Sequence, residues 1–287
     1  MKRFVFHMMF IVLTIVLINF VYLALVGGSF RNYAGKYLRF NRSASFVVLG
    51  DSHATRAWAA NRESDIYNFA HGSDNIADMR AKVEFISQNK PNNIKALILS
   101  VEPHLISTYR EIKNNSKFNN IVKNEFVGLS ALVWFPLVVD PNTELDSKVY
   151  VHALRGKISG HKNASRREFA TGTARARFRD QYVDGSASRQ LVKEYEELID
   201  YARKQGWRVI ALKYPVHPYF DSLIHARPEG QKLSSTMDSL ILSRDLQVVD
   251  YSSIVNREDL FLDQDHVNEA GSREFLKAVQ NQMTANE

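Results

Sequence analysis

Five short apolar runs alternate with stretches of helical periodicity along this chain, and the alternation limits the folds that it can adopt. The runs are residues 45–49, 66–69, 95–101, 207–212 and 246–251, and the helical stretches are 52–61, 76–89, 189–204, 228–243 and 268–283. Continuous apolar strands separated by helices are typical of a parallel sheet that is covered on both faces. We therefore predict an α/β fold, a three-layer α/β/α domain over residues 45–287.

A long segment between the third and fourth runs, residues 104–188, interrupts this alternation. Its length predicts an insertion with helices of its own. Residues 126–139 are almost wholly apolar, which favours a buried helix under the insertion, with membrane contact as the alternative. Residues 148–179 carry nine basic side chains and one acidic one. Such a patch suits anionic lipid headgroups or an acidic glycan, and the alternative is a solvated basic loop.

The N-terminus carries an apolar segment, residues 4–26, without a formally charged side chain. At about 1.5 Å per residue, a helix of this length covers roughly 34 Å, which is enough to cross a bilayer. Cleavable signal peptides have a shorter apolar region of about 7–15 residues. We therefore predict a retained single-pass transmembrane anchor over residues 1–26 and a linker over residues 27–44. Cleavage at Gly27-Gly28-Ser29 is the alternative.

The charges on either side of this segment give conflicting indications of orientation. More basic residues follow the segment than precede it, which favours a cytoplasmic body. The short tail before the segment instead resembles a signal anchor, which places the body outside the cytoplasm, and we predict that orientation.

Two features of the composition exclude other classes of protein. There is no cysteine, so disulfides, thiolate metal sites and a cysteine nucleophile are absent. The basic patch has few aromatic residues for base stacking, so we expect no nucleic-acid partner.

The first chemically informative motif is Gly50-Asp51-Ser52-His53, which follows the first apolar run and opens the first helical stretch. Glycine permits a tight turn, and the N-terminus of a helix offers unpaired N–H groups and a positive dipole end that stabilise an oxyanion. These properties make Ser52 a candidate nucleophile. The alternative is that Ser52 merely caps the helix, which is a common role of serine.

The second motif, Asp263-Gln264-Asp265-His266, lies just before the last helical stretch. A carboxylate three residues before a histidine can bind one imidazole nitrogen and leave the other free for a serine. Asp263 and His266 are therefore candidates for the orienting acid and the general base. Asp265 is expected to point elsewhere. A metal site built on Asp263, Asp265 and His266 is the alternative, although no histidine-rich partner motif accompanies them.

Together the motifs resemble those of the SGNH (GDSL-type) hydrolase superfamily, over residues 45–283 apart from the insertion. The resemblance rests on Gly50-Asp51-Ser52 and on Asp263-x-x-His266-x-Asn268-x-x-Gly271. It implies a triad of Ser52, His266 and Asp263. It also implies an oxyanion hole made by the backbone N–H groups of Ser52 and Gly72, the glycine that follows Asn68-Phe69-Ala70-His71.

The chain departs from the family pattern after the third strand, where the family has an asparagine that donates to the oxyanion. The sequence there is Ser100-Val101-Glu102-Pro103-His104. A carboxylate would repel an oxyanion, so Glu102 cannot take over this role. Either His104 or a neighbouring group donates instead, or the hole rests on the two N–H groups alone. Loss of one donor costs about 2.7–4 kcal/mol of transition-state stabilisation.

A second departure is His53, which stands where leucine is usual in the family. The G-D-S-H block after a single N-terminal span resembles membrane-anchored SGNH-like proteins of bacterial envelope polysaccharide modification, such as those of alginate O-acetylation and teichoic acid D-alanylation. This implies an O-acyltransferase at the inner (cytoplasmic) membrane, with its catalytic domain in the periplasm. Its partners would be an envelope polysaccharide and a membrane-bound acyl-donor protein. The alternatives are a carbohydrate acetyl esterase and a non-catalytic glycan-binding or assembly protein.

Several side chains outside the triad are candidates for substrate contact. They are His53, Glu102, His104, Tyr214 and His217. Tyr214 and His217 follow the fourth strand, on the edge of the sheet where Ser52 is expected, and a purely structural role in that loop is the alternative. We expect no metal or other cofactor in catalysis.

Overall fold

The structure, a computed structural model, describes residues 2–88, 93–116, 118–119 and 171–284. Its contacts divide the chain into two compact units. One comprises Met1–Arg39 and Lys117–Ser165, and the other comprises Phe40–Ser116 and Arg166–Glu287. The second unit contains the sheet and both sequence motifs.

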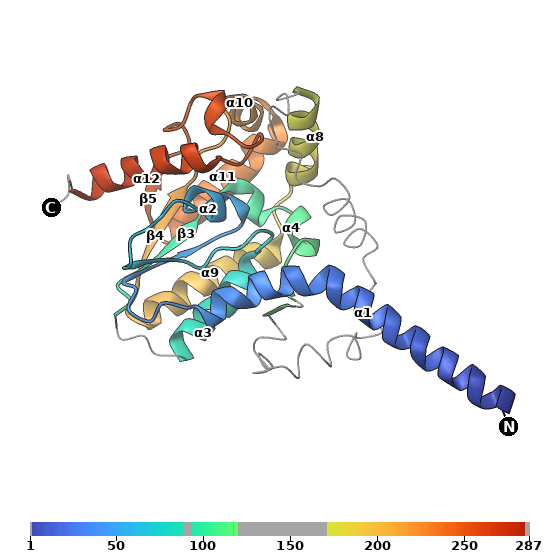
Figure 1. The fold of residues 1–287 in the computed structure, drawn as a ribbon. Coiled ribbons are helices and arrows are strands. Elements are labelled where there is room, and N and C mark those ends of the chain that lie inside the picture. The colour runs from blue at the N-terminus through green and yellow to red at the C-terminus, as the bar shows by residue number, and fades with distance from the viewer. Residues whose placement is uncertain (1, 89–92, 117, 120–170, 285–287) are drawn as a thin grey trace. The chain divides into compact units, whose positions relative to one another are not determined.

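The second unit is built on a parallel five-stranded sheet (Figure 1). Its strands are β1 (Phe46–Leu49), β2 (Ile66–Asn68), β3 (Ala96–Ser100), β4 (Arg208–Lys213) and β5 (Gln247–Asp250). Their order across the sheet is β2-β1-β3-β4-β5. In the register, Val48 lies opposite Asn68 on one side and Ile98 on the other. The predicted α/β class and all five predicted strands are confirmed.

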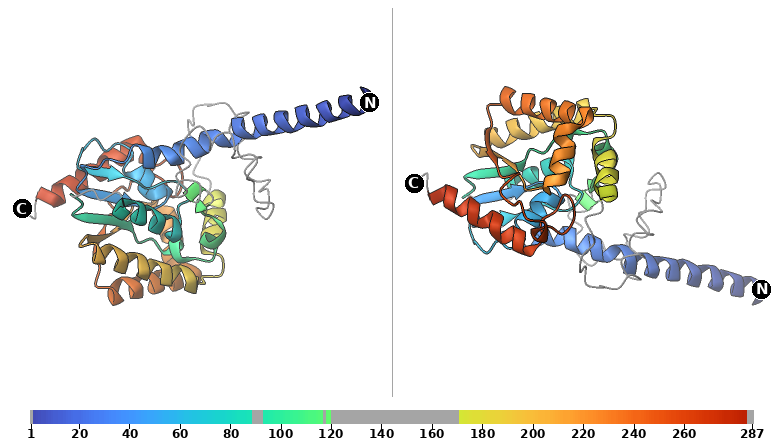
Figure 2. Two further views of the ribbon diagram at one scale, coloured as in Figure 1. Left: turned by 90° about the horizontal axis from the view of Figure 1, so that it is seen from below. Right: turned by 90° about the horizontal axis from the view of Figure 1, so that it is seen from above.

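Helices cover both faces of this sheet. They are α2 (Ser52–Ala57), α3 (Ile76–Gln88), α9 (Arg189–Lys204), α10 (Pro218–Ala226), α11 (Pro228–Ser243) and α12 (Glu269–Thr284). The helices α3 and α9 pack on each other, as do α2 and α12, and Figure 1 shows these pairs on opposite sides of the sheet. Figure 2 shows from two further directions that α2 and α12 are neighbours. The three-layer arrangement follows from these positions.

A hydrophobic core lies between the sheet and the α2–α12 layer. It includes Val48 and Ile98 from the strands, Trp58 from the end of α2, and Phe275 from α12. The ring of Phe275 meets that of Trp58 edge-on, with 5.4 Å between centroids. This packing fixes α2 against the carboxyl ends of the strands, where Ser52 begins the helix.

The described part of the insertion is mainly helical, with an isolated antiparallel bridge between Ser107 and Ala187. It contains the 3₁₀ helix η1 (Pro103–Ile106) and the α-helices α4 (Tyr109–Ile112) and α8 (Thr171–Tyr182). The apolar stretch 126–139 and most of the basic stretch 148–179 lie outside the described residues, so the predictions made for them stay predictions. A further 3₁₀ helix, η2 (Glu258–Leu260), precedes the second motif.

The first unit contains the long helix α1 (Lys2–Leu38). This helix continues through Gly27 and Gly28, where the sequence predicted a linker, because two glycines lower helix propensity without preventing helix formation. Near its end, the hydroxyl groups of Tyr33 and Tyr37 both donate to Oδ1 of Asn119. Among the residues whose side chains are described, no helix is long and apolar enough to cross a membrane.

Candidate active site

The order of the strands places both sequence motifs at one point of the sheet. Because β1 lies between β2 and β3, the chain leaves β1 towards one edge and later returns to the other side of β1. Ligands of such sheets bind at the carboxyl ends of the strands where this reversal occurs. The residues that follow β1, from Gly50 to His53, and those that follow β3, from Val101 to His104, lie at this point.

The turn between β1 and α2 is shaped by Gly50 and Asp51. A Cβ atom on Gly50 would lie 2.0 Å from Oγ of Ser100 on β3, so only glycine fits there. Asp51 is the N-cap of α2, since its Oδ1 accepts a hydrogen bond of 3.0 Å from the backbone N–H of His53. The interpretation of Ser52 as the cap is therefore wrong. Ser52 is the first residue of the helix, and its hydroxyl is not used for capping.

The acid and base predicted from the second motif form a hydrogen-bonded pair. Nδ1 of His266 lies 2.8 Å from Oδ1 of Asp263. With a proton on Nδ1, the other ring nitrogen, Nε2, carries the lone pair that a general base needs. Nε2 is buried and has no hydrogen-bond partner among the described residues. Oγ of Ser52 likewise makes no hydrogen bond in the part of the chain that is described, so the base and the nucleophile are not joined in this structure.

The loop before α12 has a shape that brings His266 to the site. The Asn268 side chain accepts hydrogen bonds from the N–H groups of Ala270 and Gly271, at 2.9 and 3.0 Å, and so caps the helix. Gly271 approaches the Leu260 carbonyl so closely that a Cβ atom would lie 2.3 Å from it. Oγ of Ser272 then donates to the carbonyl of Ala57 at 2.7 Å. This last bond ties α12 directly to α2.

Gly72, the second predicted oxyanion donor, lies in the loop between β2 and α3. Its carbonyl accepts a 3.0 Å hydrogen bond from Nδ2 of Asn115, and a Cβ atom on it would meet nothing within 4 Å. The next residue, Ser73, adopts a left-handed conformation with φ of 70°. Such strained backbone persists only where its surroundings enforce it.

Buried charges under this loop enforce its conformation. The Lys82 ammonium group is fully buried, pairs with Asp74 and donates to the Phe69 carbonyl at 2.7 Å. Asp74 also accepts from the backbone N–H of His71, at 3.0 Å, and from Nδ2 of Asn115, at 2.8 Å. Lys82 therefore compensates the charge around which the Gly72 loop is folded.

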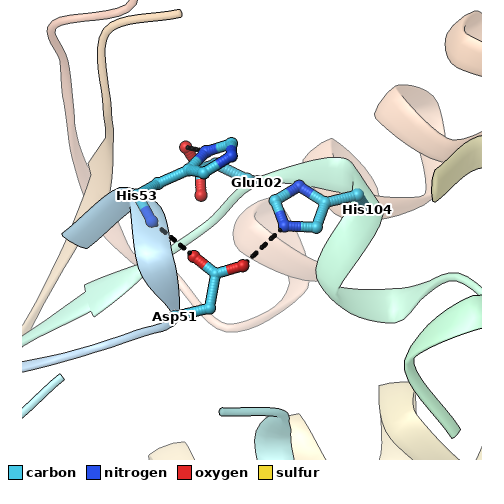
Figure 3. Close-up of side chains that lie close together, drawn as sticks. All are labelled: Asp51, His53, Glu102 and His104. Carbon is cyan, nitrogen blue, oxygen red and sulfur yellow. Dashed lines mark hydrogen bonds and ion pairs between the residues drawn. The ribbon is translucent and has the colours of Figure 1, made fainter. Parts of the chain in front are cut away.

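Four buried ionisable side chains converge between β1 and β3 (Figure 3). Nε2 of His104 lies 2.9 Å from Oδ2 of Asp51, and Nδ1 of His53 lies 2.7 Å from Oε1 of Glu102. A guanidinium nitrogen of Arg110 is 3.6 Å from the same Asp51 oxygen. The predicted candidates His53, Glu102 and His104 thus lie together with Asp51. We call these four residues the His–carboxylate cluster.

The protonation states in this cluster follow from burial and from the pairing. Burial alone would lower the pKa of His53, but the charges of Glu102 and Asp51 raise that pKa well above its usual value. Burial lowers the pKa of His104 despite the attraction of Asp51. Burial would raise the pKa of Asp51, yet His53, His104 and Arg110 hold it well below its ordinary range. These directions favour a protonated His53 and a neutral His104.

The sequence predicted that Asp265 points away from the site, and this prediction is wrong. Asp265 is 1% exposed, and its Oδ2 accepts hydrogen bonds of 2.8 Å from Nε of Arg177 and from Nε2 of Gln181. Its backbone N–H bonds to Asp263, 3.2 Å away, which turns the side chain inward. Sequence reasoning missed Arg177 and Gln181 as well. Their spacing of four residues puts both on one face of α8, but nothing in the sequence shows where that face docks.

Tyr214 and His217 occupy structural positions. Tyr214 is 1% exposed in the hydrophobic core, where its hydroxyl accepts a 3.1 Å hydrogen bond from Nε1 of Trp58. The side chain of His217 caps α10 by accepting from the backbone N–H of Tyr219, at 3.1 Å, and the backbone N–H of His217 donates to the Gln264 carbonyl. The buried position of Tyr214 and its bond to Trp58 agree with the structural alternative, and its contact with a substrate stays a prediction. For His217 the structural alternative explains the observed bonds.

The His–carboxylate cluster also contains the residues that could hold a metal ion. One ligand atom from each of Asp51, His53, Glu102 and His104 lies within 4.8 Å of the others, and His53, Asp265 and His266 form a second such group. Mixed imidazole and carboxylate donors suit divalent transition metals. In the structure these donors bond to one another, and Arg110 and His53 supply the positive charge that faces the carboxylates.

Comparison with known proteins adds no identification. No protein-family model matches the chain, and no curated protein is significantly similar to it. The parallel five-stranded α/β sheet, with its helices on both faces, is consistent with the SGNH-like fold that the two motifs imply.

Proposed function

We propose that this chain is a serine acyl-transfer enzyme, an O-acyltransferase that acts on an extracytoplasmic polysaccharide through an acyl-Ser52 intermediate. The observation that carries the proposal is the Asp263–His266 pair, whose Nε2 is buried and unpartnered near the carboxyl ends of β1 and β3. A histidine with one nitrogen oriented by a carboxylate and the other free is the general base that a serine nucleophile requires.

The reaction has two steps, acylation of Ser52 and transfer of the acyl group to the acceptor. Oγ of Ser52 attacks the carbonyl carbon of the acyl donor while Nε2 of His266 takes the hydroxyl proton. The donor's leaving oxygen then departs with that proton. In the second step a sugar hydroxyl attacks the acyl-Ser52 ester, its proton passes to His266, and the Ser52 oxygen recovers a proton as the ester breaks. Water in place of the sugar would give an esterase.

Charge development in both steps falls on the acyl oxygen. The N-terminus of α2 and the N–H of Gly72 are the donors that we assign to it. His104 does not replace the missing asparagine, since its Nε2 is bonded to Asp51. Glu102 is buried and paired with the cationic His53, so its negative charge is compensated at the position where it would otherwise repel an oxyanion.

We further propose that residues 4–26 of α1 anchor the chain in the membrane. Large apolar side chains are exposed along the first part of this helix: Phe4, Phe6, Met9, Phe10, Leu13 and Leu17. Contiguous exposed apolar surface of this kind needs a lipid or protein partner. Membranes from cells that express the full chain are expected to retain it through an alkaline carbonate wash. Its release into the supernatant would contradict the anchor.

The enzymatic proposal is tested with the full-length chain and a chromogenic acetyl ester, with and without an oligosaccharide acceptor. We expect release of the chromophore, unchanged by a chelator, and transfer of acetyl groups to the acceptor. Release of acetate alone would favour the esterase. Loss of turnover in chelator, restored by added metal, would instead assign the His–carboxylate cluster to a metal. A folded chain without turnover on any ester or donor would contradict the proposal.

A further inference from the structure

Asp265 connects the predicted base to the His–carboxylate cluster. Its Oδ1 lies 3.2 Å from Nδ1 of His266, and its Oδ2 lies 3.3 Å from Nε2 of His53. Arg177 and Gln181 on α8 hold the same Oδ2 atom at 2.8 Å. One buried carboxylate therefore receives donors from the α2 turn, from the insertion and from the base itself.

His53 is bonded at both ring nitrogens, and this decides its protonation state. Nδ1 faces Glu102 at 2.7 Å and Nε2 faces Asp265 at 3.3 Å. Carboxylate oxygens only accept, and a neutral imidazole has only one N–H donor. Both contacts are therefore hydrogen bonds only if the ring is an imidazolium. At 3% exposure, no solvent replaces either partner.

The cationic ring of His53 also lies beside the base. Its centroid is 5.2 Å from that of His266, and the two rings are nearly perpendicular. His266 thus faces two carboxylates, Asp263 and Asp265, and one cation, His53. These opposite charges act on the same proton that His266 takes from the nucleophile.

We propose that Asp265 and His53 are positioning residues that set the orientation and the proton affinity of His266 from opposite directions. This inference rests on the proposed function, because it concerns the base of that reaction. Asp265 holds the ring through Nδ1 and favours the protonated base. His53 disfavours the protonated base by like charge while it neutralises Glu102 and fixes Asp265.

The electrostatic balance agrees with this assignment. Burial lowers the pKa of His266, but the hydrogen bonds that His266 donates to Asp263 and Asp265 outweigh burial and raise this pKa, while the charge of His53 acts in the lowering direction. Among the described residues, the other charged or titratable groups around these three side chains include Asp51, Glu102, His104, Arg177 and Tyr182. A base must be unprotonated to act, so activity rises with pH through the pKa of His266.

Two substitutions in the full-length chain test the proposal. Asp265→Asn removes one carboxylate charge with little change in shape, so the acidic limb of the kcat/KM profile should move to lower pH by about one pH unit. His53→Gln removes the cation, so the same limb should move to higher pH. We expect kcat to fall by about 10²-fold in Asp265→Asn, because the contact that orients His266 through Nδ1 is weakened, with KM little changed. Asp238→Asn, an exposed carboxylate on α11, is the matched control and should shift nothing.

A second readout does not depend on turnover. Isotope-labelled histidine and NMR titration report the pKa of His266 in each variant, and the nitrogen shifts of His53 in the unaltered chain report whether both its nitrogens carry protons at neutral pH. We expect opposite movements of the His266 pKa in the two variants and a doubly protonated His53. Movements in the same direction, none at all, or a neutral His53 would overturn the inference. Absence of turnover in the unaltered chain would contradict only the enzymatic proposal.

Discussion

Replacement of Ser52 by alanine is expected to lower acyl transfer by roughly 10³-fold or more, because it removes the hydroxyl that forms the proposed acyl intermediate. Residual activity would come only from the oxyanion donors and substrate binding. The fold should be unaffected, since Asp51 and not Ser52 caps α2. Steady-state turnover of an acetyl ester by the full-length variant measures the loss.

The matched control for this prediction is Ser235→Ala on α11, where an exposed serine hydroxyl donates to the carbonyl of Gln231 within its own helix. Its turnover should lie within about twofold of the unaltered chain, because surface substitutions of this kind rarely matter. If Ser52→Ala retained turnover while remaining folded, Ser52 would not be the nucleophile. The glycan-binding or assembly alternative would then gain support.

Replacement of Lys82 by methionine is expected to lower the free energy of unfolding by about 3–5 kcal/mol. The Lys82 side chain and its partner Asp74 are both fully buried, so the substitution leaves an uncompensated charge in the interior. Asp78 lies in the same network, and burial together with the Asp74 charge already raises the pKa of Asp78 to about 6. Urea denaturation followed by tryptophan fluorescence measures the change.

Lys193→Met on α9 is the control for this prediction. The Lys193 side chain is 76% exposed and lies 3.7 Å from Glu197, so its loss should change stability by no more than about 0.5 kcal/mol. If Lys82→Met lowered the free energy of unfolding by less than about 1 kcal/mol, the Asp74 charge would not depend on Lys82 for compensation. Because the Gly72 loop is folded around this pair, we expect activity to fall together with stability.

The regular part of the fold could be predicted from the sequence because its signals are local. The limits of α9 and α11 agree with the predicted ranges, and the five apolar runs became the five strands. The α10 helix was not predicted, because it is short and begins at Pro218 after a loop that contains another proline, Pro215. Its N-cap is His217, a residue type that gives no strong capping signal.

The candidate site was predictable only in part. The Asp263–His266 bond spans three residues, so its spacing reveals it. The contacts of Asp265 with His53 and Gln181 join residues that are far apart in the sequence, and which way Asp265 points depends on the turn that its N–H makes with Asp263. The compensation of Glu102 by His53 is likewise a tertiary contact. Each motif alone gives no sign of it.

The most direct test of the central claim is detection of the acyl-enzyme. The full-length chain is mixed briefly with an activated acetyl ester, quenched in acid and digested. The mass of the peptide that contains Ser52 is then measured by mass spectrometry. The account predicts an added acetyl group on Ser52, absent in Ser52→Ala and short-lived when an acceptor hydroxyl is supplied. An acetyl group found on another residue, or none on Ser52 in a chain that turns the ester over, would contradict the account.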